Sequence, residues 1–106
     1  MINIEDFIKV ELLVGTIEKV EEVPESGKML KMEVNLGKEK RQVLAGVKKF
    51  FKPEDLIGKQ GVFVVNLEPR RILGLESQGM MLFAKDQDGI KMVTIDGKVE
   101  DGTRLS

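Results

Sequence analysis

Between Leu30 and Leu36 every second residue is apolar, and this alternation constrains the fold more than any other feature of the chain. A period of two places alternate side chains on opposite faces of a β-strand, so one face meets a core and the other meets solvent. The apolar members are Leu30, Met32, Val34 and Leu36, and Lys31, Glu33 and Asn35 stand between them.

Glycine and proline turns bound further segments of the same character, beginning with Pro24-Glu25-Ser26-Gly27. The pattern predicts strands over 12–23, 30–36, 40–47, 61–67 and 80–84, short helices at 3–7 and 53–58, and a hairpin-like tail around 91–95. Three strands, a short helix and two strands is the order of the oligonucleotide-binding (OB) fold, although strand order alone does not separate it from other small barrels. We therefore expect residues 1–106 to form a single all-β domain, a five-stranded Greek-key OB-fold barrel with one or two short helices and a C-terminal β extension.

Composition argues against catalysis. The chain has no His, Cys, Tyr or Trp, so it lacks the commonest general base and the commonest metal ligands. It also lacks a Gly-rich phosphate loop and a nucleophile elbow. We expect a protein that is not an enzyme and needs no cofactor, metal or small-molecule substrate.

Nothing in the sequence predicts contact with a membrane. The longest aliphatic and aromatic run is Val62–Val65, far short of the ~18 apolar residues of a membrane helix. The first residues lack the basic start and apolar core of a signal peptide. We expect a cytoplasmic protein.

Charge is distributed unevenly along the chain despite a net charge of −1. Residues 1–27 carry a balance of −5, residues 28–71 a balance of +6, and residues 72–106 a balance of −2. A basic block between acidic flanks can build a positive field on one face of a nearly neutral protein, although such lysines can also simply solvate strands.

The first candidate binding segment is Lys48-Lys49-Phe50-Phe51-Lys52. Lysines suit phosphates and exposed rings can stack on bases. The structural alternative, which we favour for at least one phenylalanine, is that a ring anchors the start of the following helix.

The second candidate is Asn66-Leu67-Glu68-Pro69-Arg70-Arg71, directly after the most apolar strand. Proline ends the strand and stiffens the predicted loop, and the planar guanidinium of arginine matches phosphate in two places at once. Asn66 can read a base edge or cap the loop, and the structural role is favoured.

The third candidate runs from Gly74 to Met81 and reads as a polar loop leading into an apolar strand. Ser77 and Gln78 offer hydrogen bonds. Met80 and Met81 should lie on opposite faces, one in the core and one available to a ligand.

Together these segments resemble the tRNA-binding domain family over essentially the whole chain. That family includes the C-terminal domain of bacterial methionyl-tRNA synthetase, a related domain of eukaryotic synthetase cofactors, and stand-alone tRNA-binding proteins. The matching residues are Asp6-Phe7-Ile8-Lys9-Val10-Glu11, Val14-Gly15-Thr16-Ile17, Lys28-Met29-Leu30-Lys31-Met32, Leu56-Ile57-Gly58-Lys59, Asn66-Leu67-Glu68-Pro69-Arg70-Arg71, Gly74 and Ser77-Gln78-Gly79-Met80. Leu13 and Ala45 depart from the pattern, since relatives commonly have arginine and serine there.

The resemblance implies an OB barrel that recognises folded tRNA mainly by shape, often as a homodimer. It places Lys28, Arg41, Asn66, Arg70, Ser77, Gln78 and Met80 on the RNA-facing surface. With the basic candidates added, the expected tRNA-binding residues are Lys28, Lys31, Arg41, Lys48, Lys49, Asn66, Arg70, Arg71, Ser77, Gln78 and Met80. The scarcity of aromatic residues agrees, because folded RNA read through phosphates and 2′-hydroxyls needs fewer stacking rings than single strands do.

Two other readings stay open. A chaperone-like or export-assisting protein would bind unfolded polypeptide through the six methionines, and a branch of the family fits that description. An accessory protein would tether methionyl-tRNA synthetase to its tRNA. The chain starts at Met1 and reads as a complete small protein, although a piece of a synthetase would look the same if a start codon were added. We expect a homodimer with the acidic flanks as candidates for the subunit contact.

Overall fold

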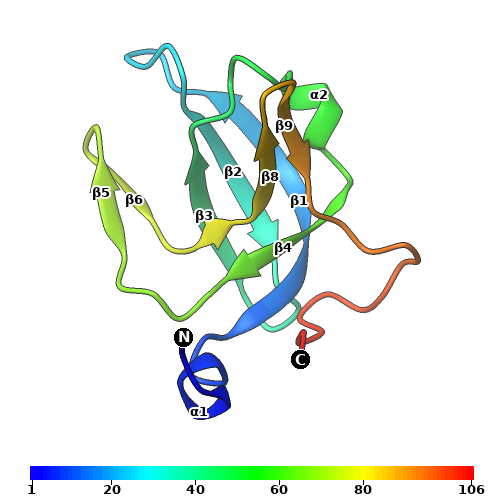
Figure 1. The fold of residues 1–106 in the computed structure, drawn as a ribbon. Helices are drawn as coiled ribbons and strands as arrows, with labels where there is room; N and C mark the ends of the chain where they lie inside the picture. The colour runs from blue at the N-terminus through cyan, green and yellow to red at the C-terminus, as the bar shows by residue number, and fades with distance from the viewer.

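The computed structural model describes all 106 residues and has β1 at the centre of its main sheet. The elements follow the order α1 (Ile4–Phe7), β1 (Leu12–Glu22), β2 (Leu30–Asn35), β3 (Lys40–Ala45), α2 (Pro53–Leu56), β4 (Gln60–Val64), β5 (Arg70–Ile72), β6 (Leu75–Ser77), β7 (Met80–Met81), β8 (Phe83–Asp86) and β9 (Gly89–Met92) (Figure 1). Five strands form one antiparallel sheet in the order β3-β2-β1-β4-β7. Neither helix is long enough to cross a membrane.

The sheet curls until β3 meets the segment that leads into β7. The N–H of Gln78 donates to the carbonyl of Gln42 at 2.8 Å, and the N–H of Gln42 donates to the side-chain oxygen of Gln78 at 3.0 Å. Strand β1 pairs with both β2 and β4, and Glu18 is an extra residue in its pairing with β2, a bulge of the kind that bends and twists a strand. The predicted five-stranded OB-like barrel is confirmed.

The alternating residues of β2 fill the barrel as predicted. Leu30, Met32, Val34 and Leu36 are all buried, and with Ile17, Val43, Leu56 and Phe63 they make up most of the core. Helix α2 caps one end of the barrel by burying Leu56 completely.

Both short helices start where the sequence predicts. The side chain of Asn3 accepts a hydrogen bond from the N–H of Asp6 at 2.9 Å, which makes Asn3 the N-cap of α1. At α2 the carboxylate of Asp55 accepts from the N–H of Lys52 at 2.8 Å, and Pro53 occupies the first turn.

The region after β4 differs from the prediction. The segment expected as two loops contains the β5–β6 hairpin, which stands away from the barrel (Figure 1). A two-residue turn closes it, with φ of 53° at Leu73 and 79° at Gly74, and this is the backbone that tight hairpins need. Asn-Gly is the usual sequence signal for such a turn, and the turn was not predicted because Leu-Gly stands here instead.

The predicted strand over 80–84 is divided into two. Met80–Met81 pairs with β4, whereas Phe83–Asp86 leaves the barrel and pairs with Gly89–Met92. The hairpin expected around Lys91–Ile95 therefore forms earlier in the chain. Met81 is buried and Met80 is 46% exposed, which confirms that the two side chains point in opposite directions.

The last residues return to the start of β1. The N–H of Val14 donates to the carbonyl of Thr103 at 2.8 Å, and the N–H of Leu105 donates to that of Leu12 at 2.9 Å. Gly37 and Gly102 make this approach possible: both have φ near +90°, and a Cβ on either would lie within 2.5 Å of a main-chain oxygen of the other segment.

Candidate nucleic-acid interface

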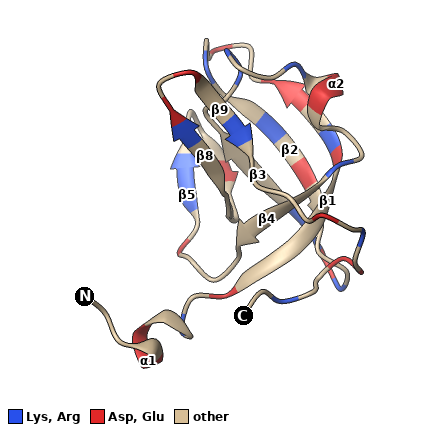
Figure 2. Ribbon diagram, turned by 45° about the vertical axis from the view of Figure 1, so that its right-hand side comes forward, with Lys and Arg blue, Asp and Glu red and all other residues tan.

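The acidic N-terminal flank lies beside the basic block, not apart from it, because β1 pairs with β2. Ion pairs join Lys31 to Glu21 at 3.5 Å, Lys48 to Glu22 at 3.3 Å and Lys40 to Glu18 at 2.9 Å. Figure 2 shows basic and acidic stretches next to one another on these strands. The outer face of β1 and β2 is therefore largely neutralised, and the free positive charge must be sought elsewhere.

The ion pair between Glu18 and Lys40 shifts the pKa values of both side chains. A hydrogen bond from Lys40, followed by one from Asn35, lowers the pKa of the Glu18 carboxyl below its ordinary value of 4.5. The same bond to Glu18 raises the pKa of Lys40 above 10.5. Both side chains are consequently charged at neutral pH and occupied with each other.

Three basic side chains without any ion pair meet around one hollow of about 460 Å³. They are Lys28 from the β1–β2 loop, Lys49 from the turn after β3, and Arg70 from β5. The remaining lining residues are Glu25, Ser26, Gly27, Met29, Ile72 and Leu73. We call this the basic hollow; three cations face a single carboxylate there.

Partly buried hydrogen bonds hold two walls of the basic hollow together. The hydroxyl oxygen of Ser26 accepts from the N–H groups of Lys28 and Met29 at 3.2 and 3.0 Å. The ammonium of Lys48 donates to the carbonyl of Ser26 at 3.3 Å, and its N–H donates to the carbonyl of Lys28 at 3.0 Å. Lys48 thus ties the turn that carries Lys49 to the loop that carries Lys28.

The third wall is the β5–β6 hairpin, which Ser77 anchors to the barrel. The buried hydroxyl of Ser77 accepts from the N–H of Leu44 at 3.0 Å and donates to the carbonyl of Gly79 at 3.0 Å. The side-chain oxygen of Gln78 likewise accepts from the N–H of Gln42 on β3. These contacts determine where Arg70 lies, and they occupy the polar atoms of Ser77.

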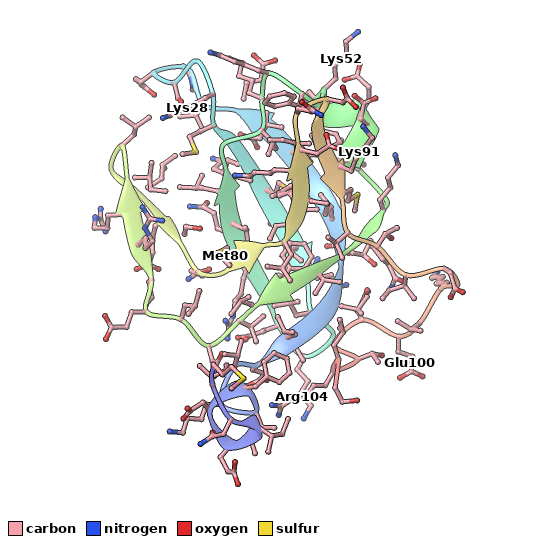
Figure 3. The ribbon with its side chains drawn as sticks, viewed as in Figure 1. Lys28, Lys52, Met80, Lys91, Glu100 and Arg104 are labelled. Atoms are coloured by element: carbon pink, nitrogen blue, oxygen red, sulfur yellow. The ribbon has the colours of Figure 1, made fainter.

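A smaller hollow of about 150 Å³ lies on the other side of Arg70. Its walls include Leu67, Glu68, Ile72 and Met80. Figure 3 shows Lys28 and Met80 on the side of the barrel that faces the hairpin. Arg70 and Ile72 therefore line both hollows.

Arg41 and Asn66 are engaged with the protein itself. The guanidinium of Arg41 donates to the carbonyls of Val65 and Gln78 and pairs with Glu39 at 2.5 Å, which ties β3 to the residues after β4. The side-chain oxygen of Asn66 accepts from the N–H of Glu11 at 2.8 Å, and its NH₂ donates to the carbonyl of Lys9 at 2.6 Å. The structural role favoured for Asn66 agrees with this geometry.

Of the eleven predicted binding residues, four line the two hollows with a side chain free for a ligand or only partly covered: Lys28, Lys49, Arg70 and Met80. Arg71 lies on the opposite face of the hairpin and donates to the carbonyl of Gly74 at 3.1 Å. Sequence reasoning missed Met29, Ile72 and Leu73, whose apolar side chains carried no signal of a ligand site. Ile72 and Leu73 belong to the unrecognised hairpin, whereas Met29 lies in the β1–β2 loop.

Of the two adjacent phenylalanines in the turn after β3, the structure uses one for packing. The Phe51 ring packs against the core and lies 5.8 Å from that of Phe83, whereas Phe50 is 52% exposed. The structural role expected of at least one ring is confirmed.

An apolar face surrounds α1, which lies at the end of the molecule opposite α2 (Figure 1). No residue of α1 is buried, and Phe7 and Ile8 are 42% and 57% exposed. With Ile4, Val10, Leu12 and Leu105 they line a second hollow of about 460 Å³. The polar rim includes Arg104, which donates to the carbonyl of Ile8 at 3.0 Å.

Comparison with known proteins gives a family and a set of similar structures. The family model described as "Putative tRNA binding domain" matches residues 12–104. The chain is 44% identical over 105 residues to the methionine–tRNA ligase of Thermotoga maritima, and 40% identical over 105 residues to that of Methanocaldococcus jannaschii. These alignments cover 99% and 98% of the chain but only 17% and 16% of the ligases, so the chain spans about a sixth of these relatives.

Solved structures of similar length superimpose over the whole chain. A MetRS related protein from Pyrococcus horikoshii has a TM-score of 0.95 at 34% identity, with 100% of this chain and 98% of that one covered. A CsaA chaperone protein from Picrophilus torridus has a TM-score of 0.92 at 31% identity, with both chains fully covered.

Proposed function

The chain belongs to the tRNA-binding domain family, and from this premise we propose that it binds folded tRNA through shape and phosphate contacts without catalysing a reaction. The observation that carries the proposal is the convergence of Lys28, Lys49 and Arg70, unpaired with any acid, on one hollow of the barrel. Cations in such an arrangement contribute binding energy by releasing counterions from the phosphate backbone.

We assign different roles to the predicted residues. Lys28, Lys49 and Arg70 contact phosphates, and Met80 contacts a sugar or a base. Ser77, Gln78, Arg41, Asn66 and Lys48 hold the surface in place, because their polar atoms already bind the protein. Lys31 and Arg71 contribute only a distant charge, since neither lines the two hollows.

Fluorescence anisotropy with unfractionated folded tRNA tests the proposal. The double variant Lys28→Gln/Lys49→Gln should bind at least tenfold more weakly than the wild type, since two phosphate contacts are lost. Lys59→Gln/Lys98→Gln is the matched control, because it removes the same charge from exposed lysines that line a different hollow. Equal losses in both double variants would mean that net charge, and not the basic hollow, determines binding.

We further propose that two copies associate through the apolar face around α1, whose residues all lie within the acidic flanks expected to form the subunit contact. Exposed apolar side chains in one patch are typical of an interface, and a two-fold pair of barrels would present two basic hollows to one tRNA. Sedimentation equilibrium should give a dimer for the wild type and a monomer for Phe7→Asp. A monomeric wild type at micromolar concentration would refute this part.

The similarity to methionine–tRNA ligases suggests the cellular setting. We propose that the chain acts in the cytoplasm, either alone or as an accessory that brings tRNA to methionyl-tRNA synthetase.

Polypeptide binding is the second candidate function, favoured by the similarity to the CsaA chaperone protein from Picrophilus torridus and by the apolar face around α1. Salt separates the two functions, since apolar contacts persist at high salt whereas phosphate contacts weaken. The basic hollow has no evident use in holding an unfolded chain, so tRNA remains the better supported ligand.

A further inference from the structure

We propose that Leu73, at the tip of the β5–β6 hairpin, packs against the base of an RNA nucleotide whose phosphate lies in the basic hollow. This inference rests on the proposed tRNA-binding function and identifies a contact residue beyond the predicted set. It also implies that the bound nucleotide is unpaired or at a helix end, because a base inside a duplex stack offers no open face.

The first supporting observation is conformational. Leu73 is the only residue other than glycine with a positive φ, 53°, and it forms a two-residue turn with Gly74 at 79°. Leucine disfavours this left-handed backbone, whereas asparagine tolerates it and Asn-Gly is the preferred pair for such a turn. The hairpin would therefore close better with another residue at this position, so local folding does not explain the leucine.

The second observation is exposure. The Leu73 side chain is 57% exposed and takes no part in the hydrophobic core. Residues held in sparsely populated backbone conformations are concentrated at ligand sites and switch regions.

The third observation concerns the residues that line the hollow beside Leu73. Leu73 lines the basic hollow together with the apolar Met29 and Ile72 and the cationic Lys28 and Lys49. A nucleotide matches this combination, since it carries a phosphate and an apolar ring face a few ångströms apart. Unfolded polypeptide would use the apolar wall but not the cations.

Opposite effects on stability and affinity give a specific test. Leu73→Asn should raise the melting temperature by about 3–5 °C, because it relieves the disfavoured turn. The same variant should bind unfractionated folded tRNA roughly five- to tenfold more weakly, because about 50 Å² of apolar contact is lost. Leu73→Met keeps an apolar side chain in the same turn and should change the affinity less than about twofold on the same basis.

Ile57→Asn is the control, since Ile57 is 48% exposed at α2, across the barrel from the hairpin in Figure 1, and should leave the affinity unchanged. If the wild type binds tRNA and Leu73→Asn binds it equally well, Leu73 is no contact residue and the inference is overturned while the proposed function stands. If the wild type binds no tRNA, both are overturned. If Leu73→Asn instead loses binding to reduced, carboxymethylated α-lactalbumin and keeps tRNA affinity, the residue serves polypeptide and the inference is again refuted.

Discussion

Replacement of Arg70 by glutamine separates the geometry of the basic hollow from simple net charge. The side chain of Arg70 makes no hydrogen bond or ion pair within the protein, so Arg70→Gln should leave the free energy of unfolding within about 0.5 kcal/mol of the wild type. A charge-assisted hydrogen bond to phosphate contributes about 1.5–3 kcal/mol, and the affinity for folded tRNA should fall about 10- to 100-fold.

The salt dependence provides an independent number. Each phosphate contact contributes about 0.7–0.9 to the slope of log affinity against log salt, so three cations predict a slope of roughly −2 to −3. Between about 50 and 200 mM salt the wild type should lose roughly 20- to 40-fold in affinity, and Arg70→Gln only about 7- to 12-fold.

Arg71→Gln is the matched control, because Arg71 is the next residue on the same strand and points to the other face of the hairpin. It should weaken binding only about twofold through long-range charge. Anisotropy titrations of both variants with folded tRNA at two salt concentrations show whether the position of Arg70 or net charge alone determines the affinity. Equal losses for the two arginines, or an Arg70→Gln slope identical to that of the wild type, would refute the reasoning.

Three further predictions concern the framework that positions the site. Ser77→Ala leaves the N–H of Leu44 buried without its acceptor and should lower the free energy of unfolding by about 1–3 kcal/mol, read from the urea midpoint; an unchanged midpoint would contradict the anchoring role. Lys40→Met should raise the pKa of Glu18 towards 4.5 in an NMR titration. Because the pKa of Glu18 is lowered in the folded state, the ion pair with Lys40 stabilises the protein above pH 4.5, and this stabilisation is lost as the pH falls through the lowered pKa. Lys40→Met should therefore lose less stability than the wild type as the pH falls from 4.5 to the lowered pKa. Gly102→Ala places a Cβ about 2.5 Å from a main-chain oxygen at a φ of +90° and should lower the melting temperature by several degrees, whereas Gly97→Ala, with open space around it, should not.

The barrel could be predicted because its signals are local. Alternation in β2 depends only on which side chains face the core, and the caps at Asn3 and Pro53 act within one helical turn. The β5–β6 hairpin was not predicted because its turn contains Leu73, and leucine is a residue type that sequence rules do not associate with a positive φ.

The site could be predicted only in part. Residue type indicated Lys28, Lys49 and Arg70 as candidate phosphate ligands, but it could not separate them from Lys31 and Lys48, which ion pairs occupy. Those pairs join residues on different strands, so they exist only once the strand register is known. The apolar face around α1 was missed for a related reason, because short apolar stretches near a terminus read as core until packing shows that nothing covers them.

A titration of folded tRNA against an unstructured RNA of equal length, at about 50 and 200 mM salt, tests the central claim most directly. Binding by shape and phosphate contacts predicts tighter binding of the folded tRNA at both salt concentrations, together with a loss of roughly 20- to 40-fold at the higher one. Equal affinity for the two RNAs would contradict recognition by shape. No binding to either RNA would contradict the function itself and direct attention to unfolded polypeptide.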